Sequence, residues 1–256
     1  MRFLILGLLP WLALGAQADE PAIIAKARAY LGSESALAQV RSLHFVCRVI
    51  RSNPDFPGDL TKEIVSPADI FFEKPSRERI AIKGDKQFIE TVIDGYDGWQ
   101  RKTALGSPPG VQLAFIGPGL MENLQADAWE NLYFYRGIET VGGTAEDRGL
   151  AAIDGIACEE VVFTHSPSIV YFRYFDQATG RLVYTRTAGG AEIREKGEIV
   201  VGGIRFPQSI VITQKNGEGK VETSTYRFDK IFVNEALADS LFTVPLGPAG
   251  DYPTQR

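Results

Sequence analysis

The side chains that could carry acid–base, nucleophilic or metal chemistry are few and poorly spaced for it. His44 and Cys47 lie three positions apart in a strand-like run, and an odd offset sends two side chains to opposite faces of a strand. The adjacent Glu159 and Glu160 diverge in the same way, and His165 lies in a Thr-His-Ser-Pro turn, where we expect it to be solvated. The chain has no H-E-x-x-H, G-x-S-x-G, P-loop or EF-hand motif. The sequence therefore predicts no catalytic residues, no metal ligands, no cofactor and no enzymatic activity.

The two cysteines, Cys47 and Cys158, allow two interpretations. In an oxidising compartment they could form a disulfide, which requires Cα atoms within about 7 Å of each other. Both cysteines nevertheless lie in strand-like runs, where a cysteine commonly serves as a small buried apolar residue. The sequence leaves both interpretations open.

The first eighteen residues have the three parts of a secretory signal peptide. Met1-Arg2 is a short positive region, Phe3–Gly15 is apolar, and Ala16-Gln17-Ala18 is a small-residue cleavage site. The apolar run is too short to span a membrane, and no cysteine follows the cleavage site to take a lipid anchor. We therefore expect a periplasmic protein with a single domain over residues 19–256 and an extended C-terminal tail from about residue 247.

Composition narrows the class of partner. The chain has 256 residues and a formal net charge of -5, which argues against nucleic acid as a partner. Its hydrophobic fraction of 45% and charged fraction of 23% are those of a globular protein. No later segment reaches about 18 uninterrupted apolar residues, so we expect no stable membrane insertion, and we expect a monomer.

The hydrophobic period changes from helical to strand-like near residue 42. A helical region is expected over residues 20–41, where Gly32 can end one helix and a serine can begin another. From Leu43 onward, runs that are typical of strands are separated by turn-forming Gly, Asp and Asn residues. Without βαβ alternation, these runs predict a mainly β (α+β) fold with one antiparallel sheet. About eleven strands are expected, near residues 43–52, 62–73, 77–83, 87–94, 97–102, 158–164, 169–175, 181–187, 192–201, 204–215 and 221–232.

Residues 104–150 interrupt the run of strands. Two turn-forming sequences, Pro108-Pro109-Gly110 and Gly117-Pro118-Gly119, bracket a loop. An amphipathic helix near residues 120–135 should follow, because an apolar stripe recurs at intervals of four through Leu120, Leu124, Ala128 and Leu132. A helix inside a long antiparallel run must cover one face of the sheet.

Several strands are apolar on both faces, for example Ile70-Phe71-Phe72 and Ile210-Val211-Ile212. An antiparallel sheet with one solvated face would alternate instead. One interpretation is an ordinary core on both sides of the sheet. The other is a curved sheet and a covering helix that enclose an apolar cavity for a hydrophobic ligand.

An ordered set of short motifs extends over most of residues 35–247. In order, the motifs are Ser42-Leu43-His44-Phe45, Phe71-Phe72-Glu73-Lys74-Pro75, Val92-Ile93-Asp94-Gly95 with Gly98-Trp99, Tyr174-Phe175-Asp176 with Thr179-Gly180, Gly203-Ile204-Arg205-Phe206-Pro207, and Phe228-Asp229-Lys230-Ile231 with Asn234 before Leu241-Phe242-Thr243-Val244-Pro245. In this order they resemble the LolA/LolB-type family of bacterial lipoprotein carriers, including its branch of outer membrane lipoprotein-sorting proteins.

The resemblance implies a strongly curved antiparallel half-barrel of about eleven strands, with helices covering its concave face and an apolar cavity beneath them. In classical carriers an arginine associated with ligand transfer precedes the proline of the second motif. Lys74 occupies that position here, and lysine does not replace the forked guanidinium of arginine. The membrane-bound receptor of the pathway would need a lipobox cysteine, which this chain lacks.

Strand parity indicates which side chains would line a lipid cavity. Alternate residues of one strand share a face, and the set containing Phe45 is the more uniformly apolar one in the first strand. The same parity selects residues of the next two strands, and the stripe of the inserted helix should descend onto them. The expected lipid-cavity residues are Phe45, Cys47, Val49, Ile70, Phe72, Ile80, Ile82, Leu120, Leu124 and Leu132.

These observations favour a soluble periplasmic carrier or binding protein for a lipid or a lipidated protein. It would bind acyl chains and take part in lipoprotein sorting or envelope biogenesis. The alternative is an envelope-stress regulatory module on the same fold that holds a membrane-anchored partner protein. An enzyme acting on an envelope lipid is a third hypothesis, which no catalytic motif favours.

Overall fold

The computed structural model describes residues 20–52, 62–106 and 110–245. The expected signal peptide over residues 1–18 and the tail from about residue 247 lie outside these ranges, so both stay predictions. Within the described ranges, no helix is long and apolar enough to cross a membrane.

Two short helices precede the sheet, as the sequence predicts. α1 (Ala22–Leu31) ends at Gly32, and α2 (Glu34–Ala38) begins after Ser33. The Ser33 hydroxyl accepts a hydrogen bond from the backbone N–H of Ala36, which satisfies one of the free amides in the first turn of α2.

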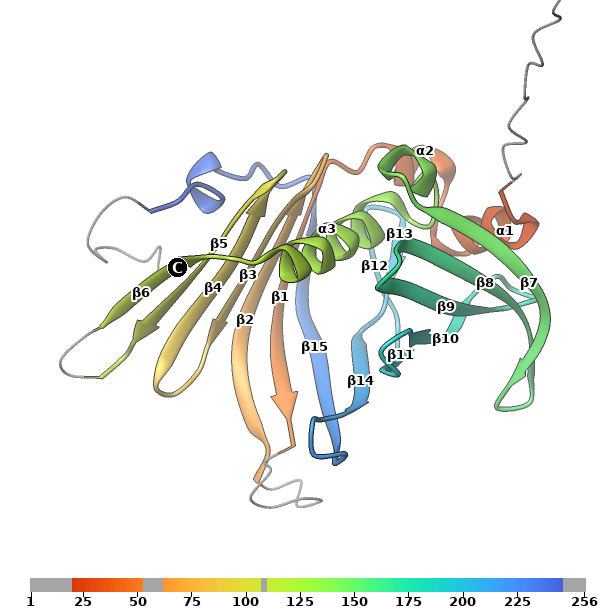
Figure 1. Ribbon diagram of the computed structural model, residues 1–256. Coiled ribbons are helices and arrows are strands. Elements are labelled where there is room, and N and C mark those ends of the chain that lie inside the picture. Colours follow the sequence, from red (N-terminus) through yellow and green to blue (C-terminus); the bar gives the residue numbers. More distant parts are fainter. Residues whose placement is uncertain (1–19, 53–61, 107–109, 246–256) are drawn as a thin grey trace, which may run out of the picture.

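Thirteen strands form one antiparallel sheet in the order β6-β5-β4-β3-β2-β1-β15-β14-β11-β10-β9-β8-β7 (Figure 1). β12 and β13 form a separate hairpin. The bounds are β1 (Ser42–Arg51), β2 (Ile64–Glu73), β3 (Arg77–Lys83), β4 (Gln87–Asp94), β5 (Asp97–Ala104), β6 (Val111–Phe115), β7 (Thr144–Ile153), β8 (Ile156–Ser166), β9 (Ile169–Asp176), β10 (Leu182–Thr187), β11 (Glu192–Lys196), β12 (Ile199–Val201), β13 (Ile204–Phe206), β14 (Ser209–Lys215) and β15 (Val221–Val233).

The mainly β, antiparallel fold is confirmed, but the strand count is not the expected eleven, and the sheet is not closed into a barrel. β6 lies in the segment 104–150 and β7 begins in it, although no strand was expected there, and the two strands form the edges of the sheet. The expected strand over 192–201 divides at Gly197, whose φ of 67° is in the left-handed region. The expected strand over 204–215 divides at Pro207, which has no N–H for a ladder hydrogen bond.

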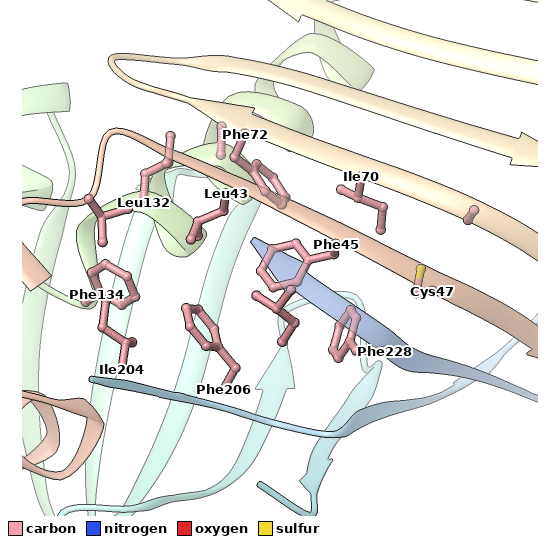
Figure 2. Packing of buried hydrophobic residues seen from close by; sticks show 14 of the residues in the cluster. Leu43, Phe45, Cys47, Ile70, Phe72, Leu132, Phe134, Ile204, Phe206 and Phe228 are labelled. Atoms are coloured by element: carbon pink, nitrogen blue, oxygen red, sulfur yellow. The ribbon is translucent and has the colours of Figure 1, made fainter. Parts of the chain in front are cut away.

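The inner face of the sheet is the side that packs against α3 (Pro118–Tyr133). Phe45 of β1 lies opposite Ile70 of β2 and Ile231 of β15, so the three side chains share this face. Figure 2 shows Phe45 among other aromatic rings, with ring centroids 5.9 Å from Phe72 and 5.1 Å from Phe228. This cluster is the largest part of the core.

α3 crosses the inner face near β2, β3 and β4 and reaches β9 on the other half of the sheet (Figure 1). Its stripe of Leu124, Ala128 and Leu132 is buried in the core, as the sequence predicts. α1 packs in a second cluster, through Ile24 and its neighbours, against Phe163 of β8 and Trp129 of α3. A lid of both helical regions over the concave face is not confirmed.

Arg28 of α1 fixes the end of α3. The backbone turns sharply there, because Phe134 and Tyr135 have φ values of 50° and 71°. The buried Arg28 guanidinium donates to the carbonyl oxygens of Tyr133 and Phe134 at 3.0 and 2.7 Å, and it also binds Glu34. These bonds satisfy carbonyl groups that a helix end leaves free.

The C-terminal segment covers part of the outer face. Phe242 packs against Phe71, Val92 and Trp99, and the Trp99 indole donates to the Phe242 carbonyl oxygen at 3.1 Å. The strands β2 and β4 therefore bury side chains on both faces. For the apolar side chains on the outer face, this finding supports the interpretation of an ordinary packed core.

The cysteines are free and buried in separate clusters, so the disulfide interpretation is wrong. Burial raises the pKa of the Cys47 thiol to about 12, with smaller contributions from the charges of Asp69 and Asp229. Both cysteines act as small apolar core residues.

Candidate functional site

The structure brings nine of the ten expected lipid-cavity residues together on the inner face. Seven are buried in the core cluster, namely Phe45, Cys47, Val49, Ile70, Phe72, Leu124 and Leu132. Ile80 and Ile82 are partly buried and pack against that cluster. Contact of these residues with a lipid stays a prediction.

Leu120 is the exception, because its side chain is 42% exposed and lies outside the cluster. α3 begins at Pro118, so Leu120 belongs to the first turn of the helix. Leu120 has the periodicity of the apolar stripe of α3, but the buried part of that stripe begins only at Leu124.

A strip of partly buried apolar side chains continues the inner face beyond the packed core. We call this set the inner strip, and it consists of Ile80, Ile82, Ile210 and Tyr226. Register places Ile210 of β14 opposite Tyr226 of β15, and Tyr226 opposite Val49 of β1. The four side chains of the inner strip are apolar and keep some exposure.

Lys74 lies in the turn after β2, beside the end of α3. Its ammonium is 4.8 Å from the centre of the Tyr133 ring, a cation–π contact. Burial, and then the positive charge of Arg28, lower the pKa of Lys74. The position at which the resemblance implies a role in ligand transfer is therefore close to α3, and that role stays a prediction.

The most unusual residue of the inner face, Glu78, was not identified from the sequence. It lies on β3 opposite Phe72 and Ile93, and none of its surface is exposed. Neither carboxylate oxygen has a hydrogen bond of normal geometry. Glu78 lies at the same alternate positions of β3 as Ile80 and Ile82. A charged residue at a position expected to face the core was therefore the sequence signal that could have identified it.

The polar group that acts on Glu78 is the carboxyl of Asp127 on α3. Burial raises the pKa of Glu78 well above its usual range, and the charge of Asp127 raises it further. Burial also raises the pKa of Asp127, which is half-buried and accepts a hydrogen bond from Asn131 at 3.2 Å. Two neighbouring buried carboxyls do not both ionise readily, so the pair holds a proton.

An ion cluster joins α3 to β8 and β9. The Glu130 carboxylate lies 2.7 Å from Nε2 of His165 and 2.5 Å from Nη1 of Arg173. The Arg173 guanidinium also lies 5.0 and 5.5 Å from the ring centres of Tyr135 and Tyr171. The expectation that His165 is solvated is therefore wrong, because only 7% of its side chain is exposed.

Glu195 of β11 faces the same interior. Register places it opposite Ile210, and its side chain makes no hydrogen bond or ion pair with any residue in the described ranges. Burial raises its pKa to about 7, although the charges of Arg173 and Arg181 oppose the shift.

We expect Glu195→Gln to stabilise the protein at about pH 8 and to have little effect near pH 4.5. Because the folded-state pKa of about 7 exceeds the unfolded value of 4.5, wild-type stability falls as pH rises through this interval. The neutral amide avoids this loss, which is about 1–3 kcal/mol for a partly exposed group. Thermal denaturation at both pH values measures it, with Glu192→Gln, an exposed residue of β11, as control. Equal effects of Glu195→Gln at both pH values would contradict the prediction.

Comparisons with known proteins support the fold. No family model and no curated protein matches the chain. A solved DUF1329-family protein from Desulfovibrio piger has a TM-score of 0.55 at 10% identity, over 87% of this chain and 96% of its own. A LolA-superfamily protein from Nitrosomonas europaea has a TM-score of 0.55 at 14% identity, over 85% and 97%.

A third solved structure is a putative outer membrane lipoprotein-sorting protein domain from Vibrio parahaemolyticus. Its TM-score is 0.53 at 8% identity, over 86% of this chain and 94% of its own. At these identities the likeness is one of fold. The chain therefore has a LolA-like fold, which confirms the resemblance drawn from the ordered motifs.

Proposed function

We propose that this protein is a periplasmic carrier or binding protein for a lipid or a lipidated protein, and that it holds acyl chains on the inner face. The LolA-like fold supports the carrier class. The observation that carries the proposal is the inner strip, where apolar side chains adjoin the core but remain partly exposed. Under this proposal the protein is not an enzyme, and its task is binding and release.

The physical chemistry of acyl chains fits an apolar strip. Each buried methylene contributes about 0.8 kcal/mol, so one long chain contributes on the order of 10 kcal/mol before ordering costs. Such a ligand needs few polar contacts along its length. In this proposal Lys74, near the end of α3, contacts the ligand or the partner protein during transfer.

Native mass spectrometry of protein purified from the periplasm, followed by lipid extraction, tests the proposal. We expect a bound species that extracts with organic solvent and carries an acyl chain. A protein that is always empty and also fails to bind fluorescent acyl probes would contradict it.

We expect Ile82→Glu to weaken acyl-probe binding by at least about tenfold, or about 1.4 kcal/mol, while the protein stays folded. Ile82 is partly exposed on the inner strip, so a carboxylate there remains hydrated but removes apolar contact area from the ligand. Fluorescence titration measures the affinity, and circular dichroism checks the fold. The control is Val65→Glu on β2, since Val65 is 50% exposed and has the opposite parity to the inner-face residue Ser66. Equal affinities of the two variants would place the ligand elsewhere.

A further inference from the structure

Glu78 is a costly residue for this position. Its carboxyl has no exposed surface and is surrounded on the sheet by Phe72 and Ile93, its partners on β2 and β4. A buried polar group without good hydrogen bonds lowers stability, and an apolar residue such as leucine would avoid most of that loss. The interior therefore holds an acidic group that folding does not need.

Among the described residues, the one cation that acts on this acidic pair, Arg173, already forms an ion pair with another carboxylate. Arg173 lowers the pKa of Asp127 through its charge, but its guanidinium forms an ion pair with Glu130 and lies over aromatic rings, while its Nε and Nη1 atoms make no hydrogen bond of normal geometry. No ion pair joins Glu78 or Asp127 to a basic side chain of the described residues, whose ion pairs lie elsewhere. Nor do the described residues offer three or more metal-ligating groups in one place, which disfavours a metal ion as the missing partner.

The acidic pair adjoins the inner strip. Ile80 and Ile82 follow Glu78 at alternate positions on the same face of β3. At the far side of the strip, burial raises the pKa of Tyr226, and the charges of Asp127 and Glu78 raise it further. Unlike the enclosed carboxyl of Glu78, the side chain of Asp127 is only half-buried.

We propose that Glu78 and Asp127 form a subsite for the cationic head of an amphiphile, such as an alkylammonium group, whose hydrocarbon chain lies on the inner strip. This inference rests on the proposed function and specifies the ligand class. The carboxyl pair would supply the charge and hydrogen-bond acceptors that a buried ammonium requires. The inner strip would supply the apolar area.

The proposal predicts that ligand binding releases protons. The charged and titratable groups that face the pair are Glu130 of α3, Tyr171 and Arg173 of β9, and Tyr226 of β15. A bound cation favours the ionised form of both carboxyls, so the proton held by the pair should leave. Affinity for an alkylammonium should therefore rise with pH from about 5 to about 8, where the amine itself stays charged because its pKa is about 10.

Three dodecyl amphiphiles with the same chain and different heads test the inference, each used below its micelle concentration. Dodecylammonium, dodecanol and dodecanoate are titrated against the protein by calorimetry in phosphate and in Tris buffer. We expect dodecylammonium to bind at least about tenfold more tightly than the other two, and its heat to depend on the buffer because protons are released. Glu78→Gln and the double variant with Asp127→Asn should remove both the preference and the buffer dependence.

The controls separate a binding role from a structural one. Glu78→Gln keeps the shape of the side chain and should raise the melting temperature at neutral pH, so misfolding would not explain a lost preference. Glu122→Gln removes an exposed charge from α3, the helix that carries Asp127, and should leave the preference for dodecylammonium intact. Equal binding of all three amphiphiles to the wild-type protein, or a preference that survives Glu78→Gln, would overturn the subsite. Failure of every dodecyl compound to bind would overturn the proposed function as well.

Discussion

Phe45→Ala should lower the free energy of unfolding by about 3–5 kcal/mol, the usual effect of removing a buried aromatic ring from a core. Phe45 is 5% exposed and lies at the centre of the inner-face cluster. Its ring is 5.1 Å from that of Phe228 and 5.9 Å from those of Phe72 and Phe206 (Figure 2). Because these rings come from β1, β2, β13 and β15, the cavity left by the truncation cannot close by moving one element.

Chemical denaturation of Phe45→Ala beside Phe115→Ala measures this effect. Phe115 lies on the edge strand β6 and is 81% exposed, so its truncation should change stability by less than about 0.5 kcal/mol. If the two variants lost similar stability, the packed cluster would not be the core of the protein.

Arg173→Ala should lower stability by about 3–5 kcal/mol, because it leaves the carboxylate of Glu130 buried without its main cationic partner. Only 9% of the Arg173 side chain and 7% of the Glu130 side chain are exposed. The guanidinium is also 5.1 Å from the centre of the Phe163 ring, so its removal takes apolar and cation–π contacts from the second core cluster. The attachment of α3 to β9 should loosen.

A second substitution separates the unpaired charge from the lost packing. Glu130→Gln in the Arg173→Ala background should recover part of the stability, because it removes the unpaired charge. As a control, Arg148→Ala breaks an exposed ion pair with Glu146 and should lose less than about 1 kcal/mol. If the double variant were no more stable than Arg173→Ala, the ion pair would not be the source of the loss.

Much of the sheet could be predicted from local patterns. β1 to β5 begin and end within two residues of the expected bounds, because short strand-like runs there are separated by turn-forming residues such as Gly84, Asp85 and Gly95. Parity then placed Phe45, Ile70 and Ile80 on one face correctly. Strand bounds and strand faces could be predicted because each depends on residues that are close together in the sequence.

The edge strands and the interior charges could not be predicted in this way. β7 contains the run Glu146-Asp147-Arg148 and is mostly exposed, so it lacks the apolar alternation that identifies a strand. His165 resembled a solvated turn residue because its partner Glu130 lies on a different element. The carboxyl pair formed by Glu78 and Asp127 depends on how α3 crosses β3, which is a tertiary relation.

The order of strands has a consequence for how the chain folds. β1 pairs with β15, and Leu43 near the start of the described chain lies opposite Val233 near its end. Contacts between such distant segments require a large loss of chain entropy before they form, which is typical of slow folding. The two halves of the sheet, β1–β6 and β7–β11, can each form from local hairpins, but only the last hairpin, β14 and β15, joins them. Synthesis from the N-terminus therefore leaves β1 as an unpaired edge until almost the whole chain is available, and this interval is when the protein is most exposed to aggregation.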